Sequence, residues 1–219
     1  DHFARVKEIF TGYYKTPANQ PDLNLRFSNV IADLMLPQRA LLGGWAMGIP
    51  ALYLLISSVR EKSYRQTVLL ALWAAALPLV HTHTFLALAL FSGGYLLGSL
   101  IEHREDRCGI LLRAGLYLAV VLALALPQLV GNAVRQTLEG GALRFQFNWV
   151  NNSGGRGLKD GYFWFWVKNA GLPFILTVCA CMCARKRGNL DIVLGMTAIY
   201  VVAETILFQP NEYDNNKLF

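Results

Sequence analysis

The chain has 219 residues, of which 54% are hydrophobic and 16% are charged, and its mean hydropathy is +0.36. Soluble domains average about 25% charged residues, so this composition excludes an ordinary soluble domain, and also a disordered, collagen-like or disulfide-stapled chain. The net charge is +6. Because the basic residues flank long apolar runs, the charge predicts membrane orientation rather than nucleic-acid binding.

A polar segment, 1–39, opens the chain, and its run Lys15–Asp22 contains two prolines and predicts a loop. A polar tail, 209–219, closes it. Since the sequence starts at Asp1 and not at Met, we expect a fragment of a longer protein. The region 40–208 between these parts holds six apolar segments: Ala40–Ser58, Thr67–Val80, Phe85–Ile101, Ala114–Val130, Phe163–Cys183 and Ile192–Phe208.

These segments predict an all-α fold, a polytopic transmembrane bundle of about six helices with exoplasmic loops. Ala40–Ser58 is close to the roughly 20 residues that a span needs. Thr67–Val80 and Phe85–Ile101 are short for a span, so the turn between them is expected to meet a protein-lined or watery cavity. The chain is thus predicted to be a multi-pass integral membrane protein.

Basic residues gather in three short connections, between the first and second, third and fourth, and fifth and sixth segments. With six spans these connections share one side of the membrane, and the positive-inside pattern predicts that this side is cytoplasmic. The residues are Arg60, Lys62, Arg65, Arg104, Arg107, Arg113, Arg185, Lys186 and Arg187. The polar parts, namely 1–39, 81–84, 131–162 and the tail, are then exoplasmic.

The tail places two carboxylates, Glu212 and Asp214, and the cation Lys217 where the last helix meets water. Such carboxylates could act as a base, hold a divalent metal ion or bind sugar hydroxyls. The alternative is a solvated loop at a helix end. No other metal or cofactor is predicted.

His81 and His83 lie two residues apart in the turn between the two short helices. This spacing is not that of a structural zinc site, so the pair would contact a phosphate, chelate another metal ion, or only bond to the backbone. Arg39 enters the first span from the exoplasmic side, where its planar guanidinium suits a phosphate. It could instead extend toward lipid headgroups.

Two charges lie inside apolar segments at similar depth, Lys168 in the fifth and Glu204 in the sixth. An unpaired charge inside a membrane costs about 2.5–3.5 kcal/mol on an insertion scale. We therefore expect these two residues to form a structural ion pair or to line the cavity.

Three stretches, Leu36–Arg39, Leu79–Phe85 and Phe208–Lys217, together resemble bacterial glycosyltransferases of the GT-C type, similar to the protein mannosyltransferase and arabinosyltransferase group. Motifs for ATP or nicotinamide binding are absent from the sequence. The resemblance implies a membrane enzyme of the cell envelope that transfers a sugar from a polyprenyl-phosphate donor to an acceptor on the exoplasmic side. It also implies a catalytic aspartate in a first exoplasmic loop, which would lie upstream of Asp1.

Under this resemblance, Arg39, His81, His83 and Lys217 would bind the donor phosphate, and Asp214 or Glu212 would hold the acceptor or a metal ion. The partners implied are membrane lipid and the lipid-linked sugar, with no nucleic acid. The alternative function is a multi-pass transporter or flippase for a polar lipid or an ion, which would use Lys168, Glu204 and the broken helices as its path.

Overall fold

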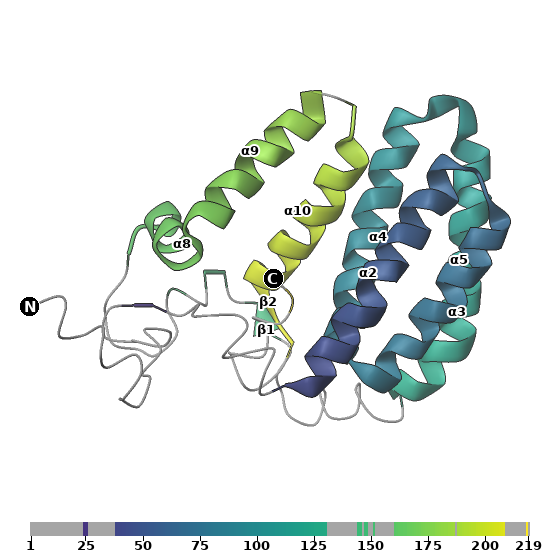
Figure 1. Ribbon diagram of the computed structural model, residues 1–219, viewed down its shortest axis with the longest axis horizontal. Coiled ribbons are helices and arrows are strands. Elements are labelled where there is room, and N and C mark those ends of the chain that lie inside the picture. Colours follow the sequence, from purple (N-terminus) through teal and green to yellow (C-terminus); the bar gives the residue numbers. More distant parts are fainter. Residues whose placement is uncertain are drawn as a thin grey trace, which may run out of the picture.

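The computed structural model describes residues 24–25, 38–130, 144–145, 147–148, 151, 160–186, 188–208 and 218. Helices α2 to α5 form an up-and-down bundle, and α10 and α9 lie beside it (Figure 1). The helices are α2 (Arg39–Arg60), α3 (Tyr64–Val80), α4 (Thr82–Glu102), the 3₁₀ turn η3 (Arg104–Asp106), α5 (Arg107–Gln128), α8 (Tyr162–Ala170), α9 (Leu172–Lys186) and α10 (Leu190–Thr205). Two short strands, β1 (Arg144–Phe145) and β2 (Ile206–Leu207), pair antiparallel.

Three of these helices are long and apolar enough to cross a membrane: α2, α4 and the run Arg104–Gln128 that contains α5. The bent pair of α8 and α9 adds a fourth if it counts as one span, and α3 is a shorter apolar helix of 17 residues. The prediction of a helical bundle is therefore confirmed, and three helices, or four with the bent pair, have the length and apolarity of membrane spans. The predicted number of six spans stays a prediction. The third predicted segment is longer than expected, because α4 extends to 21 residues.

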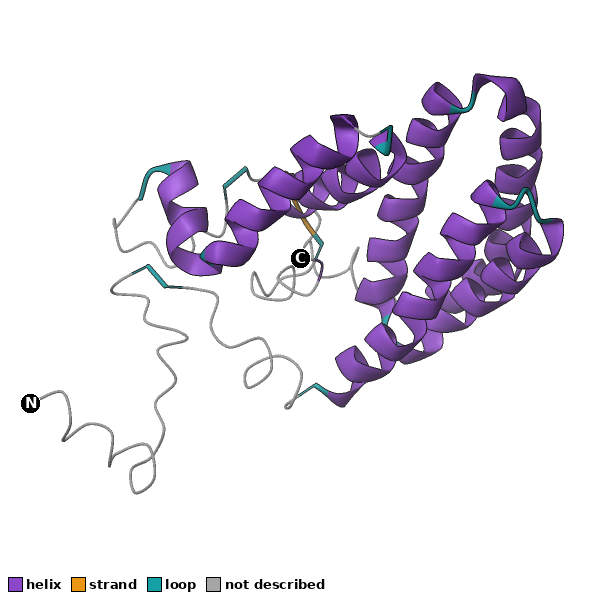
Figure 2. Ribbon diagram, turned by 45° about the horizontal axis from the view of Figure 1, so that its top comes forward, coloured by secondary structure: helices purple, strands orange, loops and turns teal. Residues whose placement is uncertain are grey.

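The fifth predicted segment, Phe163–Cys183, is not one helix. It breaks at Gly171 into α8 and α9, whose axes differ by 112°, as Figure 2 shows from a second side. Gly171 has φ +58° and ψ −138°, a combination open essentially to glycine alone. Pro173 follows two residues later and supplies no backbone N–H to continue α8.

The closest helix packing joins α4 to α10. Gly94 and Gly98, one helical turn apart on α4, lie against the backbone of Leu194 and Asp191 so tightly that a Cβ on either glycine would overlap it. From the other side, Gly195 accommodates the ring of Phe91, which would lie 2.8 Å from an added Cβ. Two glycines four residues apart are a known means of bringing membrane helices together.

Helix α3 lies between α2 and α5, and small residues again permit the contact. Ala71, Ala74 and Ala75 are at most 3% exposed. The Trp73 Nε1 donates a hydrogen bond to the Met47 carbonyl oxygen of α2 at 2.9 Å. These helices form the main apolar core together with α4.

The three basic connections meet at one end of the molecule, here called the basic end. Arg60 Nη2 donates to Asn189 Oδ1 at 3.3 Å, which joins the α2–α3 and α9–α10 connections. Arg113, only 4% exposed, donates to Asp106 Oδ2 at 2.7 Å, and Lys62 lies 4.0 Å from the same oxygen. The structure therefore brings together the connections that the sequence placed on one side.

Replacing Gly94 with alanine should loosen the α4–α10 contact, because the new methyl group meets the Leu194 carbonyl. Overpacking of this kind costs about 1–3 kcal/mol, so Gly94→Ala should unfold at a lower temperature in detergent. The matched control is Gly93→Ala, whose methyl group meets nothing within 4 Å. Equal melting temperatures for the two variants would contradict the close packing.

Candidate functional site

The opposite end of the molecule, here called the polar end, holds the predicted site residues that the structure describes. It comprises the start of α2 at Arg39, the His81 turn between α3 and α4, the β1–β2 pair, and Asp160 with the start of α8 (Figure 1). Because α10 runs antiparallel to α4, its C-terminal residues also lie here. The β1–β2 pair joins Arg144 to Leu207 just beyond α10.

The His81 side chain is the N-cap of α4. Its Nδ1 accepts a hydrogen bond from the Thr84 backbone N–H at 3.3 Å and lies 2.8 Å from Thr84 Oγ1. The residue is 8% exposed, and the half-buried His83 ring lies 5.4 Å from it, centre to centre. This Nδ1 is therefore occupied by the turn itself, which limits the predicted phosphate contact of His81 to its other ring nitrogen.

Arg39 and the His81 turn lie at the same end because α2 packs closely on the turn. A Cβ at Gly44 would lie 2.8 Å from the His81 Cβ and would overlap the Thr84 hydroxyl. Arg39 is exposed at the first position of α2, just over one turn before Gly44. The predicted phosphate-binding residues Arg39, His81 and His83 are thus on neighbouring elements.

Lys168 pairs with Asp160 rather than with Glu204. Its Nζ donates to Asp160 Oδ2, and both side chains are about four-fifths buried. Glu204 forms no ion pair among the described residues, and neither of its carboxylate oxygens has a hydrogen-bond partner. The ion pair predicted between Lys168 and Glu204 is therefore replaced by one with a residue that the sequence analysis did not select.

The Lys168–Asp160 pair belongs to a network of amides, here called the Asp160 network. Asn24 Nδ2 donates to Asp160 Oδ2 at 3.0 Å and to Asn151 Oδ1 at 2.7 Å. Asn151 Nδ2 donates to the Asp160 carbonyl oxygen at 2.8 Å, and Asn169 Nδ2 donates to the Asn24 carbonyl oxygen at 3.1 Å. Asn24 and Asn151 are at most 2% exposed, so the network ties distant parts of the chain to α8.

The hydrogen bond from Lys168 holds the pKa of Asp160 below its ordinary value of 3.8, and the bond from Asn24 and the Lys168 charge act in the same direction. Burial opposes this shift but is the smaller effect. Asp160 is therefore ionised at neutral pH and accepts hydrogen bonds from both partners. A carboxylate so engaged is suited to holding segments together.

Glu204 differs from Asp160 in that no described residue donates a hydrogen bond to it. It is 2% exposed, near the C-terminal end of α10. The contacts of Gly98 with Asp191 and of Gly94 with Leu194 fix the antiparallel register of α4 and α10. Continued along both helices, this register places Glu204 level with the first turn of α4, which His81 caps.

Two tyrosines form a hydrogen-bonded pair near Glu204. Tyr200 lies one turn before Glu204 on α10, and its hydroxyl is 2.7 Å from the Tyr162 hydroxyl, to which it is hydrogen-bonded. Phe165 and Leu207, both fully buried, complete the surrounding apolar cluster. A buried carboxyl group that no described residue holds by a hydrogen bond is a candidate for taking up or releasing a proton.

An apolar cavity of about 410 Å³ lies between α4 and α5. Phe85 and Leu129 line it toward the polar end, and Leu96 and Ala114 line it nearer the middle of the bundle. Its walls are almost entirely carbon, with Ser92 and Tyr117 as the polar exceptions. The cavity can hold a hydrocarbon chain.

Some predicted site residues lie outside the described residues, namely Glu212, Asp214 and Lys217 of the tail. Their roles stay predictions. The sequence analysis missed Asp160, Asn24 and Asn169. Asp160 and Asn24 lie in polar segments, and Asn169 is a single amide within an apolar one, so none of them carries a signal until the fold brings them together. The hydrogen bond between Tyr162 and Tyr200, 38 residues apart, likewise appears only in the fold.

Comparisons of the chain with models of protein families, with characterised proteins and with solved structures found no match. The resemblance to GT-C glycosyltransferases therefore stays a prediction.

Replacing Asp160 with asparagine should destabilise the polar end, because Lys168 loses its charged partner. We expect a loss of about 1–2 kcal/mol at pH 7, measured by thermal unfolding in detergent. Since the pKa of Asp160 is lowered on folding, its contribution is present well above pH 3.8 and is lost as the pH falls through the folded-state pKa. The difference between wild type and Asp160→Asn should thus shrink only in acid. A variant as stable as wild type at pH 7 would refute the role of the pair.

Proposed function

We propose that this chain forms the helical membrane core of a GT-C-type glycosyltransferase, which transfers a sugar from a polyprenyl-phosphate donor to an acceptor on the exoplasmic side. In this proposal α2, α3, α4, α5, the bent pair α8–α9 and α10 are six spans. The basic end faces the cytoplasm, as the positive-inside pattern favours. The polar end is then exoplasmic.

Two of these spans, α3 and α10, are short, with 17 and 16 residues. At 1.5 Å per residue they reach about 24–26 Å, less than the roughly 30 Å of a hydrocarbon core. Both end at the polar end. Short helices there leave room for a polar recess below the membrane surface, which is where a lipid-linked phosphate lies.

The observation that carries the proposal is the buried carboxyl group of Glu204 at this end of the molecule, to which none of the described residues donates a hydrogen bond. In sugar transfer the acceptor hydroxyl attacks the anomeric carbon, the bond to the donor phosphate breaks, and the hydroxyl proton must be taken up. Glu204 as a carboxylate would accept that proton, and the exposed Arg39 would neutralise the leaving phosphate. The apolar cavity between α4 and α5 would hold only a part of the polyprenyl tail.

The transporter alternative has one observation in its favour, the 112° break between α8 and α9. Broken helices next to a buried carboxyl group occur in transporters, where they form the ion site near the middle of the membrane. Glu204 lies instead within the last turn of α10. Its position near a helix end favours the enzyme.

The orientation can be tested by labelling single cysteines in intact cells, with the four native cysteines replaced by serine. We expect a cysteine at Arg39 to react with a membrane-impermeant maleimide from outside. A cysteine at Lys62 should react only after the cells are opened. Labelling of both from the same side would refute the six-span arrangement.

Glu204→Gln keeps the shape of the side chain but removes its ability to accept a proton. Transfer of labelled sugar from a panel of polyprenyl-phosphate donors, measured in membranes, should fall at least about 100-fold. Glu61→Gln, an exposed carboxylate at the basic end, is the control and should keep wild-type rates. Undiminished transfer by Glu204→Gln would contradict the proposed role, and a block of proton-driven uptake without any transfer activity would favour the transporter.

A further inference from the structure

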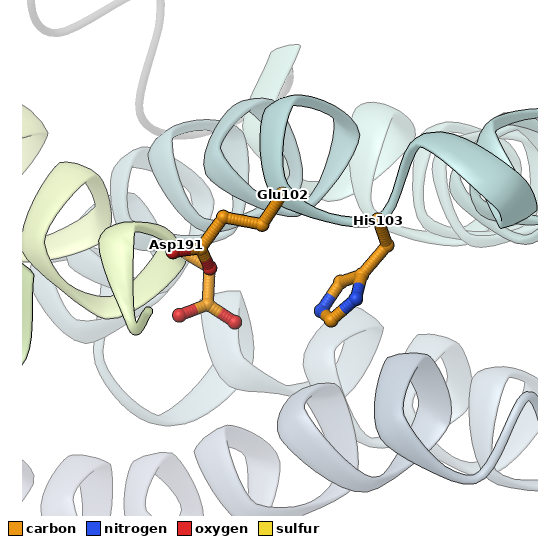
Figure 3. Close-up of side chains that lie close together, drawn as sticks. All are labelled: Glu102, His103 and Asp191. Atoms are coloured by element: carbon orange, nitrogen blue, oxygen red, sulfur yellow. The ribbon is translucent and has the colours of Figure 1, made fainter. Parts of the chain in front are cut away.

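Three side chains of metal-ligating type meet at the basic end, far from the proposed site. Glu102 is the last residue of α4, His103 follows it, and Asp191 lies in the first turn of α10. One ligand atom from each lies within 4.8 Å of the others. Figure 3 shows the three side chains extending to the same side of the two helices.

Each carboxylate uses one oxygen to hold the start of α10. Glu102 Oε1 accepts a hydrogen bond from the Leu190 backbone N–H, and Asp191 Oδ1 accepts one from the Ile192 N–H, both at 2.7 Å. Hydrogen bonds at the start of α10 therefore account for one oxygen of each carboxylate. The second oxygen of Glu102 is buried and has no hydrogen-bond partner among the described residues.

The carboxylates of Glu102 and Asp191 lie close together. Asp191 is 2% exposed, and within the described part of the chain neither Glu102 nor Asp191 has an ion-pair partner within 4.0 Å. Two neighbouring carboxylates that are largely removed from water repel each other unless a proton or a cation lies between them.

The Tyr95 hydroxyl is a second, independent observation at this cluster. It is fully buried on α4, and its hydroxyl lies next to the Asp191 carboxylate. Nevertheless that hydroxyl makes no hydrogen bond of good geometry to any described residue. A buried hydroxyl aimed at this cluster would be satisfied by a water molecule bound to a metal ion.

From this geometry we propose that Glu102, His103 and Asp191 bind a divalent transition-metal ion such as Zn²⁺, which fastens the end of α4 to the start of α10. Two carboxylate oxygens and one imidazole nitrogen, with water in the fourth position, are a ligand set suited to Zn²⁺ or Mn²⁺. Mg²⁺ and Ca²⁺ prefer oxygen ligands alone. The ion would neutralise the two carboxylates.

His103 lies beside a further carboxylate. Its Nδ1 is 3.8 Å from Glu105 Oε1, too far for a hydrogen bond, so the ring is not held by this contact. One nearby group opposes the ion: the Arg60 guanidinium, which bonds to Asn189 and lies near the Tyr95 hydroxyl. Its positive charge gives the proposal a distinctive test.

The full chain, purified in detergent without a histidine tag and stripped of metal with a chelator, is titrated with Zn²⁺ by calorimetry. We expect one ion per chain. The variants Glu102→Gln and His103→Gln should each weaken binding at least ten-fold, and His103→Gln should fold normally because this side chain is 43% exposed. Arg60→Gln should tighten binding several-fold because it removes the opposing charge.

The control is Glu61→Gln, which removes an exposed carboxylate of the same end outside the cluster and should bind Zn²⁺ as the wild type does. Thermal unfolding gives a second readout, since Zn²⁺ should raise the melting temperature of the wild type but not of His103→Gln. Absence of stoichiometric binding would overturn the proposal. Binding that survives in both Glu102→Gln and His103→Gln would overturn it as well, since the ion would then be adventitious.

Discussion

The contact between α4 and α10 is the constraint on which the rest of the molecule depends. Gly94 and Gly98 let the two backbones touch, and this contact fixes both the separation and the register of the helices. At one end the register sets Asp191 beside Glu102. Toward the other end it carries Glu204 to the level of the His81 turn. A single pair of glycines therefore determines which polar groups can meet at either end of the bundle.

Much of the fold could be predicted from the sequence because apolar runs and basic connections are local signals. Each of the six apolar segments corresponds to helical structure, and the connections at Arg60 and Arg113 do lie together. Hydropathy could not reveal the break at Gly171, because the break depends on a backbone conformation within a continuous apolar run. It also could not set the length of α4, whose first turn is held by the polar residues His81 and Thr84.

The site was less predictable, for a physical reason. Lys168 and Glu204 share a depth in the sequence pattern, but which carboxylate reaches Lys168 depends on the path of the segment before α8, and that carboxylate is Asp160. Asn24 joins the Asp160 network through hydrogen bonds to residues that lie more than 100 positions further along the chain. Gly94 and Gly98 can be read from the sequence, but their spacing does not say which helix packs against them. The structure shows that this helix is α10.

The break at Gly171 has a mechanical consequence. If the proposed fifth span crosses the bilayer through α9 alone, the 112° bend turns α8 nearly parallel to the membrane surface. There Phe163 and Trp164 are exposed while Phe165 and Trp166 are buried against the molecule, an arrangement suited to the headgroup layer. Such an interfacial helix would fix the depth of the bundle in the bilayer. A change in bilayer thickness would then be taken up by a change of the angle at Gly171, without tilting the packed helices.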